Sequence, residues 1–415
     1  MPKPFLREFE IKSKSTANEG GYASVYKVKH LKLGYIRALR VLHATIEDEN
    51  DPKYLQFLEE CRLLLRIGNG GHRNIVRIFQ PRLVDNKAFV EMEYIEGTDL
   101  YDFLAKNKGF IPMEEYYRFA FQVADALAYC HHDIYRYCMD LDEDGIEDDE
   151  NGNPVITPEV ERKLVEKYQV IHNDIHSKNI MRRMDGEYIL LDFGLAVQNG
   201  NTVRSSTRKA GVYEYMAPEK FEDSGVLTTR TDVYAFGILM YEMLCGTVPF
   251  KLEGDAPSQI YNLQMKQMND PVPSFFKARK ACYEKSHPGS TYVRDFPKWL
   301  EEVIMKCLEK NPADRYNDCR ELLDDMKMHM AESGVSADGT LNVESQGLLK
   351  GKIAALSREI EEKDRLISSL EGKLTEKDLV IENLKDNSSH SSLSRRIREL
   401  EKENESLRNK KKWPW

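Results

Sequence analysis

The stretch His172-Asn173-Asp174-Ile175-His176-Ser177-Lys178-Asn179 decides the fold of this 415-residue chain. It places an aspartate five residues before an asparagine, two positions behind a histidine. An Asp and an Asn at this spacing also occur by chance in turns. Here a second motif follows in register, because Leu191-Asp192-Phe193-Gly194 puts another aspartate 13 residues after Asn179. The two motifs together predict a functional site, from which the rest of the sequence can be interpreted.

Five more motifs lie before and after this pair. They are Asn18-Glu-Gly-Gly-Tyr-Ala-Ser-Val25, Arg37-Ala38-Leu39-Arg40, Met92-Glu93-Tyr94-Ile95-Glu96-Gly97, Gly211-Val-Tyr-Glu-Tyr-Met-Ala-Pro-Glu219, and Asp232-Val-Tyr-Ala-Phe-Gly237 with Arg315. Each motif alone is weak evidence, but seven in this order are specific. Over nearly all of residues 10–325 the chain resembles the protein kinase family.

The resemblance implies the parts of a phosphoryl-transfer site. Asp174 would accept the proton of a substrate hydroxyl, and Asn179 and Asp192 would hold Mg²⁺ or Mn²⁺. His176 lies where serine/threonine kinases usually carry Lys, and Lys178 lies where tyrosine kinases carry Arg, so the catalytic loop leaves the hydroxyl class open. The form of the segment that ends in Ala-Pro-Glu favours serine/threonine. The expected partner is therefore a protein substrate.

The resemblance also implies an ATP site. Arg40 stands where the family has a Lys that contacts the phosphates and pairs with a Glu on the next helix, here Glu60 or, as the alternative, Glu59. The other residues expected to contact ATP are Asn18, Gly20, Gly21 and Ala23 in the phosphate-covering loop, Val25, Ala38 and Met181 around the adenine, Met92, Glu93 and Ile95 in the hinge, and Asp192.

Two departures from the family pattern affect activity. A planar guanidinium at residue 40 is not a conservative exchange for Lys at a phosphate site, although Lys27 or Lys29 could reach the cleft as a substitute. Asn173 replaces the Arg that usually binds a phosphorylated activation segment. The candidate phosphorylation sites in that segment are Thr202, Ser205, Ser206 and Thr207. We expect a protein kinase, with a pseudokinase that binds nucleotide or acts as a scaffold as the alternative.

The order of predicted elements favours an α+β, two-lobed kinase fold over residues 5–330. Short β-rich runs and one helix, Pro52–Ile67, predict a β-rich amino-terminal lobe at 5–97. Helical patterns dominate from Met113 onward and predict a carboxy-terminal lobe at 98–330. The predicted strands are Ser24–Lys29, Tyr35–Leu42 and Ala88–Tyr94, and the predicted helices of the second lobe are Glu114–His131, Asp232–Cys245 and Lys298–Leu308.

An acidic insert interrupts the second lobe at residues 133–169. Its run from Asp140 to Asp148 places carboxylates at alternate positions, as the opening of a Ca²⁺ loop does. The twelfth position is Asn151 rather than the bidentate Glu of an EF-hand. The sequence allows two interpretations of this run, a Ca²⁺ site or a solvated acidic loop.

Composition narrows the class of protein. A net charge of −9 gives no basic field for nucleic acid, so no nucleic-acid partner is expected. The seven cysteines form no CxxC pair, which favours free thiols in a reducing compartment. The start of the chain lacks the apolar segment of a secretory signal, and no apolar run is long enough to span a membrane. These features predict a cytoplasmic location.

Beyond a linker at 331–346, heptads predict a coiled coil at 347–411 with a break at 386–392. Ile353, Ile360 and Ile367 share one heptad position and Leu356 and Leu370 the other, which favours a parallel homodimer over a single amphipathic helix. The basic and aromatic tail 412–415 resembles a membrane-interface flank. If the parent protein continues past Trp415, the chain would be the cytosolic part of a membrane-anchored protein.

Overall fold

The computed structural model describes residues 8–14, 23–69, 71–139, 144, 146, 154–193, 196–198, 213–221, 226–254, 256–333, 363, 365, 367–380 and 391–410. The chain divides into two compact units, Met1–Thr340 and Leu341–Trp415. Within these described ranges, no helix combines the length and the apolar character needed to cross a bilayer. All seven cysteines are free thiols, and six of them are buried.

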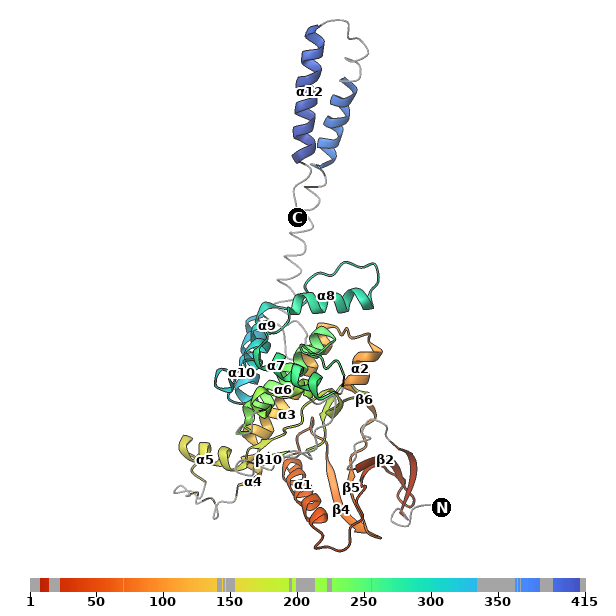
Figure 1. The fold of residues 1–415 in the computed structure, drawn as a ribbon, viewed down its shortest axis with the longest axis vertical. Helices are drawn as coiled ribbons and strands as arrows, with labels where there is room; N and C mark the ends of the chain where they lie inside the picture. The colour runs from red at the N-terminus through yellow and green to blue at the C-terminus, as the bar shows by residue number, and fades with distance from the viewer. Residues whose placement is uncertain are drawn as a thin grey trace. The chain divides into compact units, whose positions relative to one another are not determined.

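The amino-terminal lobe is one antiparallel sheet with a helix packed against it (Figure 1). The strand order is β1-β2-β3-β5-β4, and β2–β3 pairing sets Val25 opposite Arg40. The helix α1 packs against β4 and β5. The bounds are β1 (Phe9–Lys14), β2 (Ala23–His30), β3 (Ile36–Leu42), α1 (Pro52–Asn69), β4 (Ile78–Val84) and β5 (Lys87–Met92).

The carboxy-terminal lobe is built around α6, which is buried along almost its whole length. Its buried residues are mostly apolar, as expected of a helix in the centre of a lobe, and α3, α8, α9 and α10 contact it. Outside the acidic insert, the described α-helices of this lobe are α2 (Leu100–Lys106), α3 (Met113–Ala128), α6 (Thr229–Cys245), α7 (Pro257–Asn269), α8 (Phe275–Ser286), α9 (Lys298–Cys307) and α10 (Cys319–Ser333).

Small sheets and single turns of helix position the catalytic loop between the lobes. The loop leaves β7, forms the turn η3 and enters β8. Gly97 at the start of β6 lies so close to β8 that a Cβ would be 2.1 Å from the Arg182 carbonyl oxygen. The bounds are β6 (Gly97–Asp99), β7 (Val170–Ile171), η3 (Ser177–Asn179), β8 (Ile180–Arg183), β9 (Tyr188–Leu190), β10 (Val197–Gln198), η4 (Tyr213–Tyr215), η5 (Pro218–Phe221) and η6 (Pro312–Asp314).

The acidic insert contains regular structure that the sequence analysis did not predict. The helix α3 continues as a π-turn, η2 (Tyr129–Asp133), followed by α4 (Tyr135–Cys138) and later by α5 (Pro158–Tyr168). Thr157 caps α5 through its side chain, and Pro158 occupies the first turn. Asp144 is buried, bonded to Lys167 and to the Tyr168 hydroxyl (2.8 Å). Most of the run Asp140–Asp148 lies outside the described residues, so the Ca²⁺ hypothesis is not tested there.

The second unit contains two helical segments, residues 367–380 and α12 (Ser391–Lys410), which run side by side in Figure 1. Lys377 Nζ lies 2.7 Å from Glu403 Oε1 and joins the two segments. Ile397 and Leu400 of α12 are buried. The first heptads, including Ile353 and Ile360, and most of the predicted break fall outside the described residues.

Candidate active site

A buried aspartate at the start of α6 holds the catalytic loop. Asp232 Oδ2 accepts from the His172 backbone N–H (2.6 Å), and its Oδ1 accepts from the Asn173 backbone N–H (2.8 Å). The π-turn η2 brings His131 Nε2 to 3.0 Å from Oδ2. Burial alone would raise the pKa of Asp232, but His131 and the other donors outweigh it and lower the pKa.

Asp174 carries the carboxylate at the centre of the site. Its Oδ2 accepts from Asn179 Nδ2 (3.0 Å), which also donates to the Asp174 carbonyl oxygen (2.8 Å). Its Oδ1 is buried and has no hydrogen-bond partner among the described residues. A buried acceptor without a donor is costly, so this oxygen is set up to receive a proton donor from a ligand. Asn179 and Asp174 therefore act as one fixed unit.

Neighbouring side chains keep Asp174 ionised. Burial raises its pKa, but His176, then His172 and Lys220, lower it by more, and the net pKa is below the ordinary value for Asp. His176 Nε2 lies 3.7 Å from Asp174 Oδ2. Lys178 is exposed and places its ammonium 4.9 Å from the centre of the Tyr101 ring. The carboxylate is thus in the state that can accept a proton.

The second aspartate, Asp192, lies at the end of β9 with a left-handed backbone (φ +46°). The next residue, Phe193, is buried, with its ring 4.5 Å from the His172 ring. His172 Nε2 also lies 2.8 Å from the Leu191 carbonyl oxygen. These contacts fix Asp192 beside the catalytic loop and leave 32% of its side chain exposed. Gly194 falls outside the described residues.

Arg40 joins three elements at the back of the cleft. Its Nη1 lies 3.1 Å from Glu60 Oε2 on α1, and its Nη2 lies 3.7 Å from Asp192 Oδ1. The alternative partner, Glu59, is exposed and pairs with Arg62 instead. Burial lowers the pKa of Arg40, but Asp192 and Glu60 raise it by more, so the guanidinium stays charged. The amino-terminal lobe is thereby held with α1 turned toward the site.

The residues expected around adenine lie together at the hinge. Ala38 pairs with Met92 across β3 and β5, and Met92 and Met181 pack against a cluster that contains Ile95. The Glu93 backbone N–H donates to the Arg77 carbonyl oxygen (2.8 Å). Val25 and Ala23 lie on β2, whereas Asn18, Gly20 and Gly21 fall outside the described residues. Met92, Ile95 and Met181 thus lie in one apolar cluster of the predicted ATP site.

The two lysines predicted as possible substitutes for Arg40 both lie on β2. Lys27 Nζ is 4.2 Å from the centre of the Tyr94 ring at the hinge, and Lys29 is exposed on β2. Arg40 is the cation that contacts both Glu60 and Asp192 in the described part of the cleft.

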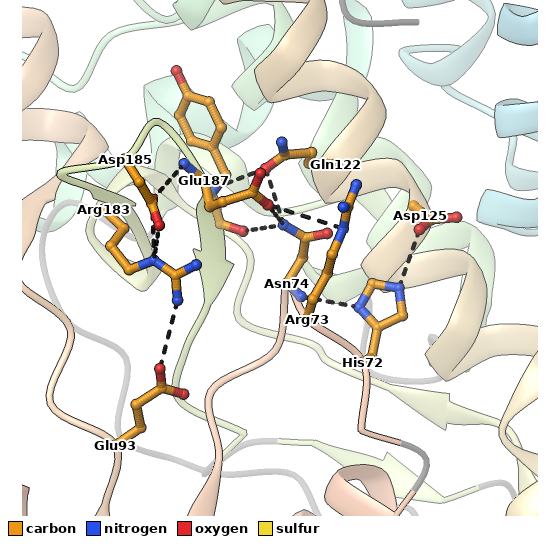
Figure 2. A network of polar contacts seen from close by, with 10 residues as sticks. His72, Arg73, Asn74, Glu93, Gln122, Asp125, Arg183, Asp185 and Glu187 are labelled. Atoms are coloured by element: carbon orange, nitrogen blue, oxygen red, sulfur yellow. Dashed lines mark hydrogen bonds and ion pairs between the residues drawn. The ribbon is translucent and has the colours of Figure 1, made fainter.

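Figure 2 shows a joint between the lobes that the sequence analysis missed. Asn74, buried in the loop after α1, donates from Nδ2 to the Tyr188 carbonyl oxygen (2.8 Å), Gln122 Oε1 (2.9 Å) and Glu187 Oε2 (3.2 Å). In the same network, His72 Nε2 lies 3.2 Å from Asp125 Oδ2. No local signal in the sequence identifies Asn74, because its partners lie 48 to 114 residues away.

Two further contacts of the catalytic loop also escaped sequence reasoning. Tyr215 donates its hydroxyl hydrogen to Glu242 Oε2 (2.5 Å) and lies 2.9 Å from Ser177 Oγ. Lys220 Nζ donates to the Asn173 carbonyl oxygen (2.9 Å) and to Asn173 Oδ1 (2.7 Å). Both contacts join the catalytic loop to residues on either side of the Ala-Pro-Glu motif.

The structural ion pair of that segment is also formed. Glu219 and Arg315 are buried and make two parallel hydrogen bonds, at 2.9 and 3.0 Å. Thr231 Oγ1 donates to the same carboxylate (3.0 Å). This bidentate geometry anchors the segment to the carboxy-terminal lobe.

Three curated proteins resemble the chain over most of its length. A probable serine/threonine-protein kinase of Clostridium perfringens is 27% identical over 311 residues, which are 74% of this chain and 36% of that protein. A second, from Clostridium acetobutylicum, is 29% identical over 309 residues, 74% of this chain and 38% of that protein. The serine/threonine-protein kinase PknB of Mycobacterium tuberculosis is 26% identical over 347 residues, 81% of this chain and 46% of that protein. The chain thus spans less than half the length of these relatives.

The sequence pattern of one protein family matches both lobes described above. The protein kinase domain matches residues 12–144 and 163–327, which together are well over half of the chain. The matched segments contain Arg40, Glu60, Asp174, Asn179 and Asp192, and the unmatched gap lies inside the insert. The chain belongs to the protein kinase domain family.

Proposed function

We propose that this chain is an active serine/threonine protein kinase, which transfers the γ-phosphoryl group of ATP to a protein hydroxyl. The observation that carries the proposal is the state of Asp174. Its Oδ2 is occupied by Asn179, while its buried Oδ1 has no partner among the described residues. An ionised carboxylate with one oxygen fixed and the other waiting for a donor is suited to accept a hydroxyl proton.

The other residues of the site supply position and charge. Protein kinases use MgATP, which when bound supplies the phosphoryl group and the cation that neutralises its charge. Asn179 and Asp192 present amide and carboxylate oxygens, which are the ligands that Mg²⁺ prefers. Arg40 keeps Glu60, and with it α1, next to the site. The apolar hinge surface formed by Ala38, Met92 and Met181 suits an adenine ring.

The hydroxyl class is inferred from the relatives. Curated relatives that share 24–29% of their aligned residues carry the name serine/threonine-protein kinase. In this chain the segment around Tyr215 is fixed by Glu242 and Ser177, next to the catalytic loop. The names of these relatives support a serine or threonine hydroxyl as the acceptor.

One observation favours the pseudokinase as the second candidate. The Arg40 guanidinium lies 3.7 Å from Asp192 Oδ1, where it competes with a metal ion for the carboxylate. If that contact persisted with nucleotide bound, the protein would bind nucleotide without turnover. We favour the active enzyme because Asp174, Asn179 and Asp192 carry more of the chemistry than the cation at residue 40 does.

The test is incorporation of phosphate from γ-labelled ATP into a generic protein acceptor with Mg²⁺, by the wild-type chain and by Asp174→Asn. Acid hydrolysis of the product then identifies the labelled amino acid. We expect phosphoserine or phosphothreonine from the wild type and none from Asp174→Asn. Equal label from both proteins would contradict the kinase proposal, and phosphotyrosine alone would contradict the hydroxyl class.

We also propose that the second unit joins two copies of the chain. Heptads at 347–411 favour a parallel two-stranded coil. Ile367, which lies at one of the predicted heptad positions, stays exposed and is available to another copy. In this proposal the coil brings two kinase domains together. A separate proposal, based on the composition of the chain, is a cytoplasmic location.

A further inference from the structure

Lys220 connects the end of the activation segment to the catalytic loop. It is the residue directly after Glu219, in the turn η5 (Pro218–Phe221). Its ammonium donates to both oxygens of Asn173, the carbonyl oxygen at 2.9 Å and Oδ1 at 2.7 Å. Because Glu219 is fixed by Arg315 and Thr231, the backbone that carries Lys220 is anchored independently of the catalytic loop.

Asn173 presents both acceptors because its own backbone is constrained. It has a left-handed conformation (φ +65°), which Asn adopts more readily than most residues. Its N–H is bonded to Asp232 at 2.8 Å. With the N–H fixed on that side, the carbonyl and side-chain oxygens are turned toward Lys220. The next residue along the chain is Asp174, so the contact acts on the backbone of the proposed catalytic base.

Lys220 also brings a cation to the residue directly before Asp174. In sequences of the family pattern, an Arg at position 173 would provide a cation here and bind a phosphorylated activation segment. In this chain the cation comes from the segment itself and the acceptor lies on the loop. Relative to the family pattern, the cation and its acceptor have exchanged places, and the contact forms without a phosphate group.

We propose that Lys220 is a positioning residue that holds Asp174 in its working position without phosphorylation of the activation segment. The inference rests on the proposed kinase function and adds how that site is kept in order. It predicts that phosphate on Thr202, Ser205, Ser206 or Thr207 is not required for turnover. Charge-assisted hydrogen bonds of this length are the strong ones, and two of them converge on one residue.

The experiment compares variants of the full chain at saturating MgATP. Lys220→Met removes the cation with little change in volume, and we expect kcat to fall about 10- to 100-fold, with KM for ATP within about twofold. Lys220→Arg should recover most of the rate. A variant with Ala at Thr202, Ser205, Ser206 and Thr207 should keep the wild-type kcat. Lys298→Met, an exposed Lys of α9 paired with Glu302, is the matched control and should change nothing.

A second variant separates positioning from folding. Asn173→Gly keeps the left-handed backbone and the carbonyl acceptor but removes Oδ1, so its loss of kcat should be smaller than that of Lys220→Met. If the two residues act as a pair, the double variant should be no slower than Lys220→Met alone. Additive losses would overturn the proposal.

Other results would also overturn it. If Lys220→Met turns over at the wild-type rate, the contact does not position the base. If the four-Ala variant loses activity while the wild type is active, the activation segment needs its phosphate after all. An inactive wild type would instead mean that the proposed function has failed and this inference with it.

Discussion

At the scale of single residues, the site differs from its family most at Arg40. The guanidinium satisfies Glu60 and approaches Asp192, so it maintains the arrangement of α1 while its fork is turned toward carboxylates. A bidentate donor prefers such partners, whereas an ammonium is a compact point charge that can move to a phosphate.

We therefore expect Arg40→Lys to increase kcat/KM for ATP by about tenfold, the effect of one charge-assisted hydrogen bond. Steady-state kinetics with varied MgATP would measure it. Arg40→Met serves as the control and should lower kcat/KM, because it leaves Glu60 buried without its cation. A lower kcat/KM in Arg40→Lys would mean that the guanidinium itself contacts the phosphates.

A second residue-scale prediction concerns Glu242. Burial raises its pKa from 4.5 to about 7, although the hydrogen bond from Tyr215 acts in the opposite direction. Between those two pH values the folded protein binds more protons at this group than the unfolded chain does, so its contribution to stability falls as pH rises. Glu242→Gln should lose this dependence and be more stable than the wild type at pH 8 by about 1–3 kcal/mol.

Denaturant unfolding of both proteins at pH 5, 6, 7 and 8 would measure this difference. The informative quantity is the wild-type minus variant free energy, because other groups titrate equally in both. If that difference did not change with pH, Glu242 would be ionised throughout and the assignment would be wrong.

The sequence predicted Asp174, Asn179 and Asp192 as site residues, because each lies at a fixed distance from the others along the chain. It was not enough for Lys220 and Asn74. Their partners, Asn173 and Tyr188, lie 47 and 114 residues away, and a Lys or an Asn in a loop is an ordinary surface residue until the fold is known. The sequence already favoured Glu60 over Glu59, and in the structure Arg40 pairs with Glu60.

At the scale of elements, hydrophobic periodicity predicted the helices of the two lobes but not the secondary structure of the acidic insert. The predicted Pro52–Ile67 and Asp232–Cys245 correspond to α1 (Pro52–Asn69) and α6 (Thr229–Cys245). The predicted helix Glu114–His131 ends in the π-turn η2, whose extra residue per turn has no signature in hydrophobic spacing. The acidic composition near Asp140 favoured a loop throughout the insert, so the sequence analysis did not predict α5, which Thr157 caps.

The loop after α1 yields a prediction about how the lobes are held. Asn74→Ala removes three hydrogen bonds, including the one that Asn74 donates to the Tyr188 carbonyl oxygen, so we expect about 1–3 kcal/mol of destabilisation. Urea unfolding of the full chain would measure it. Asn269→Ala is the matched control, since Asn269 is exposed and donates only to Met265 of its own helix. Equal losses in the two variants would contradict a role for the joint.

At the scale of the whole molecule, the tail is the part that the sequence described least completely. The heptad pattern predicted helices, and residues 367–380 and α12 are helical. Whether the heptads pair between copies depends on a second chain, because Lys377 and Glu403 already pair within one. Side-chain spacing alone does not distinguish these two arrangements.

We predict that the full chain sediments as a dimer of the 48.1 kDa polypeptide and that residues 1–340 sediment as a monomer. That end point leaves α10 complete, since this helix ends at Ser333. Sedimentation equilibrium over a range of concentrations would measure both masses. Identical monomer masses would exclude dimerisation through the tail.

The central claim is that Asp174, Asn179 and Asp192 form a working phosphoryl-transfer site despite Arg40. The most direct test measures kcat and the MgATP dissociation constant for the wild-type chain and for Asp174→Asn, side by side. Loss of a positioned base predicts that kcat falls by about 10²–10⁴-fold in the variant while the dissociation constant stays within about twofold. Nucleotide binding with no measurable turnover in either protein would contradict the claim and establish a pseudokinase.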